Sequence, residues 1–104
     1  MRKLFIVILL LGIFLSGCTT QKSDVELAKE LCIKKCKEEL KNYPNPENGP
    51  CISDEIIKDW VCDVAHFPRI EEDNFPQNQC NAYRAGVAHH FVEVDTECNF
   101  IRSY

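Results

Sequence analysis

The sequence lacks three features, and each absence disfavours a class of protein. Its longest apolar run, Leu4–Leu15, has twelve residues, which as a helix extend over roughly 18 Å and fall short of the ~30 Å hydrocarbon core of a bilayer. No Cys-x-x-Cys pair is present, which disfavours a dithiol redox protein. After position 17 the chain carries ten basic and sixteen acidic residues, a formal charge of −6, whereas general nucleic-acid binding relies on neutralising phosphates. We therefore expect neither a membrane-spanning helix nor a nucleic acid partner.

The first eighteen residues have the three-part layout of a secretory signal. Arg2 and Lys3 form a basic start, the apolar run follows, and small residues precede a cysteine in Leu15-Ser16-Gly17-Cys18. These last four residues resemble the lipobox of prokaryotic lipoproteins. The resemblance implies cleavage just before Cys18 and attachment of lipid to its sulfur. A plain secretory signal is the alternative, but it has no use for a cysteine at this position.

The resemblance divides the chain into three parts and implies a location. Residues 1–17 would be a lipoprotein signal peptide, residues 18–23 a lipidated tether, and residues 24–104 a cysteine-rich globular domain. We expect the protein at the cell membrane, lipid-anchored and facing the extracytoplasmic space, because two acyl chains at ~0.8 kcal/mol per buried CH₂ hold a protein durably on a bilayer. The membrane, through the lipid on Cys18, is thus an expected partner, and an envelope protein is a further candidate.

Six cysteines remain once Cys18 is assigned to lipid, and an even number in a small exported domain predicts three disulfides. Cys32 and Cys36 are one helical turn apart on one face, so they are poorly placed to bond each other and are expected to reach two other segments. A Cys36–Cys51 bridge would close the loop between them, as one of fifteen pairings. Metal ligation or redox use is the alternative for Cys32 and Cys36. The six are Cys32, Cys36, Cys51, Cys62, Cys80 and Cys98.

A long amphipathic helix is predicted over residues 24–41. Ser23 and Glu26 form a capping-box pattern, and apolar residues recur at helical spacing from Val25 to Leu40. Three prolines and an Asn-Gly pair then exclude regular structure over residues 42–50.

Shorter elements separated by turns follow the proline-rich loop. Trp60 is expected to anchor the core from a mostly buried strand or turn. The predicted fold is a small disulfide-rich α+β domain, with one long N-terminal helix packed on a short antiparallel sheet that ends in a C-terminal β-hairpin. The expected elements are a helical turn over residues 53–58, a strand or turn over 60–65, a solvated acidic loop over 70–79, helical turns over 79–85 stopped by Gly86, and a hairpin of 87–94 and 100–104.

The histidines supply weak candidates for catalysis. On a strand, His89 shares one face with Glu93 and Asp95, whereas His90 lies on the apolar face and is expected to be a core histidine. His66 could join the first three from another segment. His89 and Glu93 would stand about 13 Å apart at ~3.3 Å per residue, too far for direct ligation of one metal. We therefore expect no metal and no cofactor.

No nucleophile–base pair or ligand set passes these spacing tests, which favours a non-enzymatic function. The leading hypothesis is a membrane-anchored extracytoplasmic lipoprotein that serves as a binding or envelope-structural module, cross-linked by three disulfides. The alternative is a small metal-dependent or His/acid hydrolase that uses His66, His89, Glu93 and Asp95.

Overall fold

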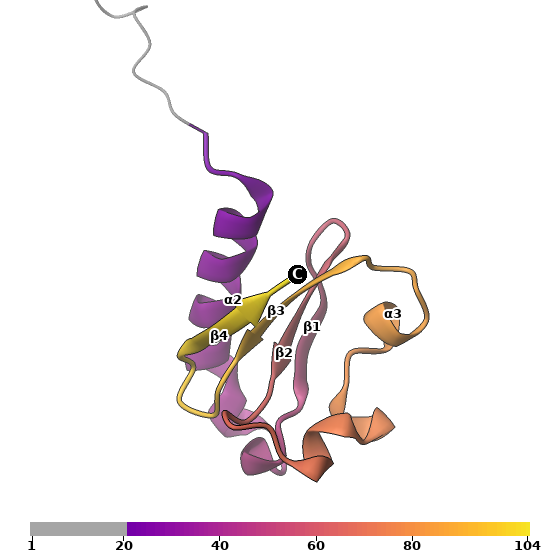
Figure 1. The fold of residues 1–104 in the computed structure, drawn as a ribbon. Coiled ribbons are helices and arrows are strands. Elements are labelled where there is room, and N and C mark those ends of the chain that lie inside the picture. The colour runs from indigo at the N-terminus through magenta and orange to yellow at the C-terminus, as the bar shows by residue number, and fades with distance from the viewer. Residues whose placement is uncertain (1–20) are drawn as a thin grey trace, which may run out of the picture.

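A four-stranded sheet with different layers on its two faces makes up the fold, in a computed structural model that describes residues 21–104. Helix α2 (Asp24–Glu39) covers one face, and short turns with helix α3 (Asn81–Arg84) lie over the other (Figure 1). The predicted signal peptide, the lipidation site Cys18 and the first part of the tether lie outside the described residues. Within residues 21–104, no helix has the length and apolar character needed to cross a membrane.

Helix α2 begins at the predicted capping box. The Ser23 hydroxyl accepts the backbone N–H of Glu26, and the Glu26 carboxylate accepts the backbone N–H of Ser23, both at 3.3 Å. Ala28, Cys32 and Cys36 are buried along one face. The helix then tightens into a 3₁₀ turn over Leu40–Asn42, so the predicted helical stretch is confirmed with a different geometry in its last turn.

The sheet is mixed, because its central pair of strands is parallel. The order β1-β2-β3-β4 follows the chain, with antiparallel β1–β2 and β3–β4 pairs on either side of a parallel β2–β3 pair. The α+β fold and the terminal hairpin are thus confirmed, whereas an antiparallel sheet is wrong for the central pair. The strands are β1 (Cys51–Ile57), β2 (Trp60–Val64), β3 (His90–Val94) and β4 (Phe100–Ser103).

The helical turn predicted over residues 53–58 is wrong, because residues 53–57 belong to strand β1. Ser53 does accept a backbone N–H as a cap would, from Glu55 at 3.1 Å. That bond lies where the register of β1 against β2 shifts. Pairing with β2 therefore outweighs the local capping preference.

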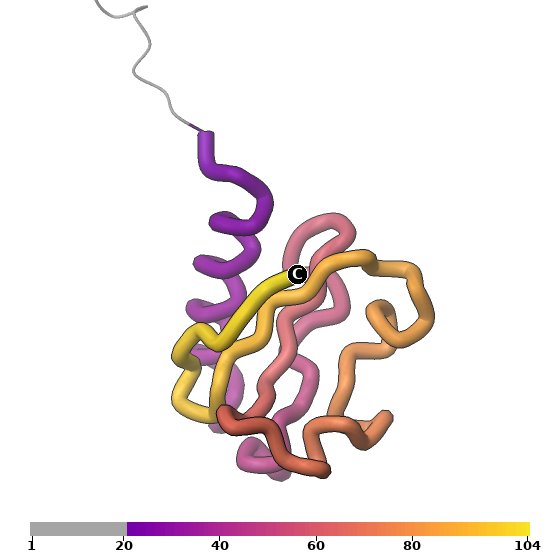
Figure 2. The backbone as a smooth tube through the Cα atoms, in the orientation of Figure 1, coloured from indigo at the N-terminus to yellow at the C-terminus, as the bar shows by residue number. Residues whose placement is uncertain are grey.

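Residues 65–89 form the crossover that a parallel pair requires. The crossover passes through two 3₁₀ turns, Glu71–Asn74 and Pro76–Asn78, and then α3, as the tube in Figure 2 shows. α3 is followed by Gly86 at φ 76°, which confirms the predicted stop. The acidic stretch is less solvated than expected, since Asp73 is only 2% exposed.

The two faces of the sheet bury different clusters. Residues that alternate along β2 and β3 point to opposite faces, so Trp60 and Val92 join the core beneath α2, and Trp60 is confirmed as a core residue. On the other face, Val61 packs with Cys80 and Ala88.

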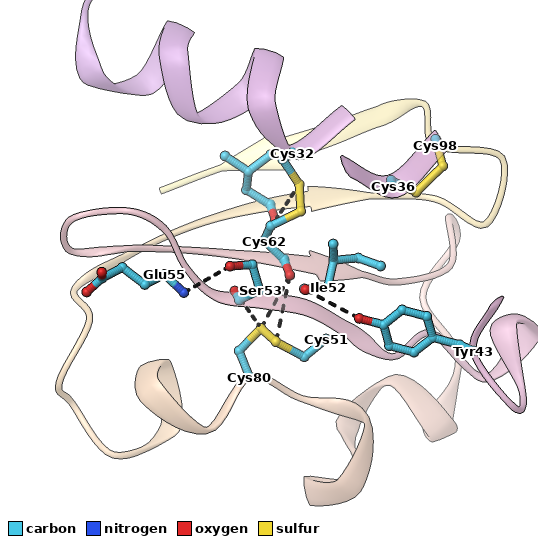
Figure 3. Close-up of a disulfide and its surroundings, with 11 residues drawn as sticks. Cys32, Cys36, Tyr43, Cys51, Ile52, Ser53, Glu55, Cys62, Cys80 and Cys98 are labelled. Atoms are coloured by element: carbon cyan, nitrogen blue, oxygen red, sulfur yellow. Dashed lines mark hydrogen bonds between the residues drawn. A yellow bond between two sulfur atoms is a disulfide. The ribbon is translucent and has the colours of Figure 1, made fainter. Parts of the chain in front are cut away.

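The described residues contain three disulfides, which tie the sheet to both layers (Figure 3). Cys32–Cys62 joins α2 to β2, Cys36–Cys98 joins α2 to the β3–β4 turn, and Cys51–Cys80 joins β1 to the crossover. The two cysteines of α2 thus reach separate segments, as predicted. A Cys36–Cys51 bridge is wrong, because Cys51 points away from α2 to the opposite face of the sheet.

Candidate functional site

Two acidic residues lie side by side on the sheet face opposite α2. Asp63 of β2 and Glu93 of β3 are partners in the parallel register, which places their backbones about 4.8 Å apart. The residues are only 8% and 5% exposed. Alternation along the strands accounts for this placement, because their neighbours Cys62 and Val92 face α2.

A cleft of about 380 Å³ opens over these two carboxyl groups. This volume lies at the small end of the range of small-molecule sites. The sheet and the crossover both contribute to it. The lining residues from the sheet are Val61, Asp63, Phe91, Glu93 and Arg102, and those from the crossover are Arg69, Gln79, Cys80, Tyr83 and Arg84.

Asp63 is the unsatisfied group of the cleft. Its Oδ1 atom is buried and has no hydrogen-bond partner among the described residues. Burial raises the pKa of Asp63 to about 8, and the adjacent Glu93 carboxylate adds to the rise, while Arg69 opposes it. At neutral pH the side chain is therefore largely a neutral carboxyl, which can donate a hydrogen bond as well as accept one.

Glu93 is held between two arginines. Arg69 Nη1 donates to Glu93 Oε2, and Arg102 Nε donates to Glu93 Oε1, each at 2.8 Å. Both carboxylate oxygens are therefore engaged by charge-assisted hydrogen bonds. Arg84, the third arginine of the cleft, makes no ion pair with any residue of the described range.

One wall of the cleft is covalently attached to the sheet. The Cys51–Cys80 bridge lies against β2, with Cys80 Sγ 3.4 Å from the Cys62 carbonyl oxygen (Figure 3). Two residues along, the Ala82 N–H donates to Asp54 at 2.9 Å. This attachment sets the position of α3 over the sheet.

Two aromatic rings supply an apolar part of the cleft. Tyr83 of α3 meets Phe91 of β3 edge to face, with ring centroids 5.2 Å apart. Both residues are among those lining the cleft. The cleft thus combines polar groups with an aromatic surface, as small-molecule sites commonly do.

A second groove, of about 350 Å³, shares Arg69, Glu93 and Arg102 with the cleft and is also lined by His66. His66 Nδ1 lies 2.9 Å from Asp73 Oδ1, and Asp73 also accepts the backbone N–H of His66 and of Ile70. Burial acts to raise the pKa of Asp73, but these hydrogen bonds outweigh it and lower that pKa below its usual value. Asp73 therefore orients the imidazole of His66.

The four residues predicted as catalytic candidates do not form one site. His66 and Glu93 both line the second groove. His89 instead pairs with Asp59, at 2.7 Å, at the other end of the parallel strands and about 13 Å from Glu93 at ~3.3 Å per residue. Asp95 accepts two backbone N–H groups of the β3–β4 turn, at 2.8 and 2.9 Å, and so shapes that turn.

His90 is not a core residue, contrary to the sequence-based expectation. Its side chain is 43% exposed, and its ring stacks on Trp60 with centroids 4.6 Å apart. Its Nδ1 atom lies 3.1 Å from the Tyr104 carbonyl oxygen. His90 is on the apolar face of the strand, as expected, but it is the first residue of β3. Its ring therefore lies at the edge of the core, with one side toward solvent.

Sequence reasoning did not select Asp63 or the arginines of the cleft. A signal for Asp63 exists, because it is the lone acid in the apolar stretch 60–65 and acids are rarely buried without a partner. Arg69, Arg84 and Arg102 carry no comparable signal. Their convergence depends on the parallel register and on the path of the crossover.

One set of metal-ligand residue types lies close together in the described part of the chain: Cys51, Asp54 and Cys80. The two sulfurs are bonded to each other, and a metal would require thiolates. In this oxidised state the set does not fit a metal ion.

No known protein family, curated protein or solved structure matches the chain.

Proposed function

We propose that the protein is a membrane-anchored extracytoplasmic lipoprotein whose globular domain is a non-enzymatic binding module, with the cleft over Asp63 and Glu93 as its binding site. The observation that carries this proposal is the Oδ1 atom of Asp63, which is buried and unpartnered beside a cleft of about 380 Å³. Such an atom costs free energy unless something bonds to it. Asp63 lines the cleft, so a ligand there would satisfy its carboxyl group.

The composition of the cleft favours binding over covalent catalysis. Cys80 is the one cysteine among the described residues lining it, and its sulfur is in a disulfide. The Glu93 carboxylate is occupied by two arginines, which disfavours a role as general base.

NMR tests the binding function: the backbone amide chemical shifts of the ¹⁵N-labelled protein in detergent micelles are compared with and without added compounds. A mixture of small acids, amines and neutral amides should shift the amides of β2, β3 and α3 and leave α2 unchanged. If no compound shifts residues of the cleft, the binding function fails.

The lipid anchor rests on the four residues that end in Cys18, and one substitution tests it. Cys18→Ser should move the protein from the membrane fraction to the soluble fraction, because the sulfur that carries the acyl chains is gone. Ser16→Ala, which keeps a small residue before the cysteine, is the matched control and should leave the protein in the membrane. A membrane-bound Cys18→Ser protein would contradict the anchor.

A hydrolase is the second candidate, and the specific observation in its favour is His66, oriented by buried Asp73 next to a groove. Neutral imidazole held in this way can act as a general base. Turnover of chromogenic esters that His66→Gln abolishes and His89→Gln preserves would support this reading over the binding module.

A further inference from the structure

We propose that the ligand of the cleft is a small organic carboxylate, which pairs with the guanidinium of Arg84, accepts a hydrogen bond from Asp63, and packs its apolar part against Tyr83 and Phe91. This inference rests on the proposed binding function and specifies the chemistry of its ligand. It assigns a role to the charged and aromatic groups of the cleft together.

The balance of charge in the cleft favours an anion. Three arginines line it against the single carboxylate of Glu93, since Asp63 is largely neutral at pH 7. Arg69 and Arg102 are engaged with Glu93. Arg84 remains for a ligand. The domain as a whole is acidic, so this local positive excess is a property of the cleft and not of the general surface.

Asp63 explains why a carboxylate fits better than a neutral group. A neutral carboxyl donates one O–H, and an O–H to carboxylate oxygen bond is among the stronger hydrogen bonds. Asp63 lines the cleft, so its carboxyl group would donate this bond to a ligand there. The size of the cleft limits the occupant to a small molecule.

Binding of a carboxylate should weaken at alkaline pH through Asp63. Above its pKa of about 8, Asp63 loses the proton that it would donate and becomes a like charge, so affinity should fall up to about tenfold per pH unit. The groups that face it also set its charge. They are Glu93 of β3, Arg102 of β4, Arg69 and Asp73 of the first half of the crossover, and Tyr83 and Arg84 of α3.

Calorimetric titration of the full protein in micelles with phenylacetate is the direct test. Phenylacetate should bind at least about tenfold more tightly than phenylacetamide, which has the same shape without the charge, and more tightly than phenethylamine. Arg84→Gln should weaken the binding of phenylacetate about tenfold or more. Lys34→Gln removes an exposed positive charge from α2 and should leave affinity unchanged.

The pH profile supplies an independent readout for Asp63. Affinity of the wild type should fall between pH 7 and 9, and Asp63→Asn, which keeps a donor but cannot ionise, should remove that fall. Equal binding of the amide, an Arg84→Gln variant with full affinity, or a flat wild-type profile would each overturn the proposal. Tighter binding of inorganic phosphate would overturn the carboxylate assignment.

Different results would contradict the carboxylate assignment and the binding function of the cleft. If neutral or cationic compounds shift the amide resonances of the cleft and phenylacetate does not, the carboxylate assignment is wrong and the binding function stands. If no compound of any charge shifts these resonances, both the carboxylate assignment and the binding function are wrong.

Discussion

Asp63 gives the domain a pH dependence opposite to that of most carboxylates. Folding raises its pKa from the ordinary 3.8 to about 8, chiefly through burial. Between these values the folded state holds a proton that the unfolded chain has lost, so stability falls as the pH rises, by at most about 1.4 kcal/mol per unit. Asp73 acts in the other direction. Its lowered pKa contributes stability above its unfolded value, and that stability is lost as the pH falls.

Asp63→Asn isolates this contribution, because it removes the titrating proton and keeps the shape. Relative to the wild type, the variant should gain roughly 1–3 kcal/mol in unfolding free energy between pH 5 and pH 7.5. Urea denaturation with intact disulfides at the two pH values measures this gain. Glu97→Gln, at an exposed position, should show no such gain. A constant difference between Asp63→Asn and the wild type would mean that Asp63 is ionised in the fold.

Glu93 has a structural role as well as its place in the cleft, because it pairs with two arginines over a buried strand. Glu93→Gln should lower the free energy of unfolding by about 1–3 kcal/mol. One of the two oxygens that accept from an arginine becomes an NH₂ donor, and the other loses its negative charge. This loss of stability is below the cost of breaking a fully buried pair, because Arg69 and Arg102 keep 34% and 56% of their side chains exposed and solvent screens them. Arg102→Gln should cost less than Glu93→Gln in the same urea titration, and the reverse order would contradict this account.

At the level of elements, the sequence patterns correctly predicted those features that depend on hydrogen bonds and backbone conformation between residues close in the chain. The Ser23–Glu26 capping box and the Gly86 stop are both present as expected. The parallel pairing of β2 and β3 was missed because nothing local encodes it. An apolar strand such as Trp60–Val64 suits either direction, and the direction is set by where residues 65–89 return the chain. The cleft depends on that return, so only His66 and Glu93 of its surroundings were foreseen.

The Cys51–Cys80 bridge should hold the crossover against the sheet, and its removal tests this. A Cys51→Ser/Cys80→Ser double variant should cost about 3–4 kcal/mol, as expected for closing a loop of this length, with sequence separation 29. Hydrogen exchange should accelerate over residues 65–89 and stay slow in α2, because Cys32–Cys62 and Cys36–Cys98 still hold that helix. Uniform acceleration throughout the domain would show that the bridge stabilises the whole fold and not this wall alone.

At the scale of the whole molecule, the disulfides and the burial of apolar side chains together stabilise the packing on the two faces of the sheet. One cluster of buried residues lies beneath α2, and a smaller one lies under the crossover. Cores of this size contribute only ~3–5 kcal/mol net in small domains. Each bridge can add about 2–4 kcal/mol by restricting the unfolded chain. The bridges together therefore outweigh the net contribution of the core.

Full reduction of the three bridges should consequently unfold the domain at room temperature. Trp60 reports this directly, because it is the single tryptophan of the chain and is only 7% exposed in the fold. Its fluorescence should shift to the red when dithiothreitol opens all three bridges, and far-UV circular dichroism should lose most of its helical signal. A thiol titration on the same sample establishes that six sulfurs have been released. Native emission from fully reduced protein would show that apolar burial alone sustains the fold, and that the disulfides are not required for it.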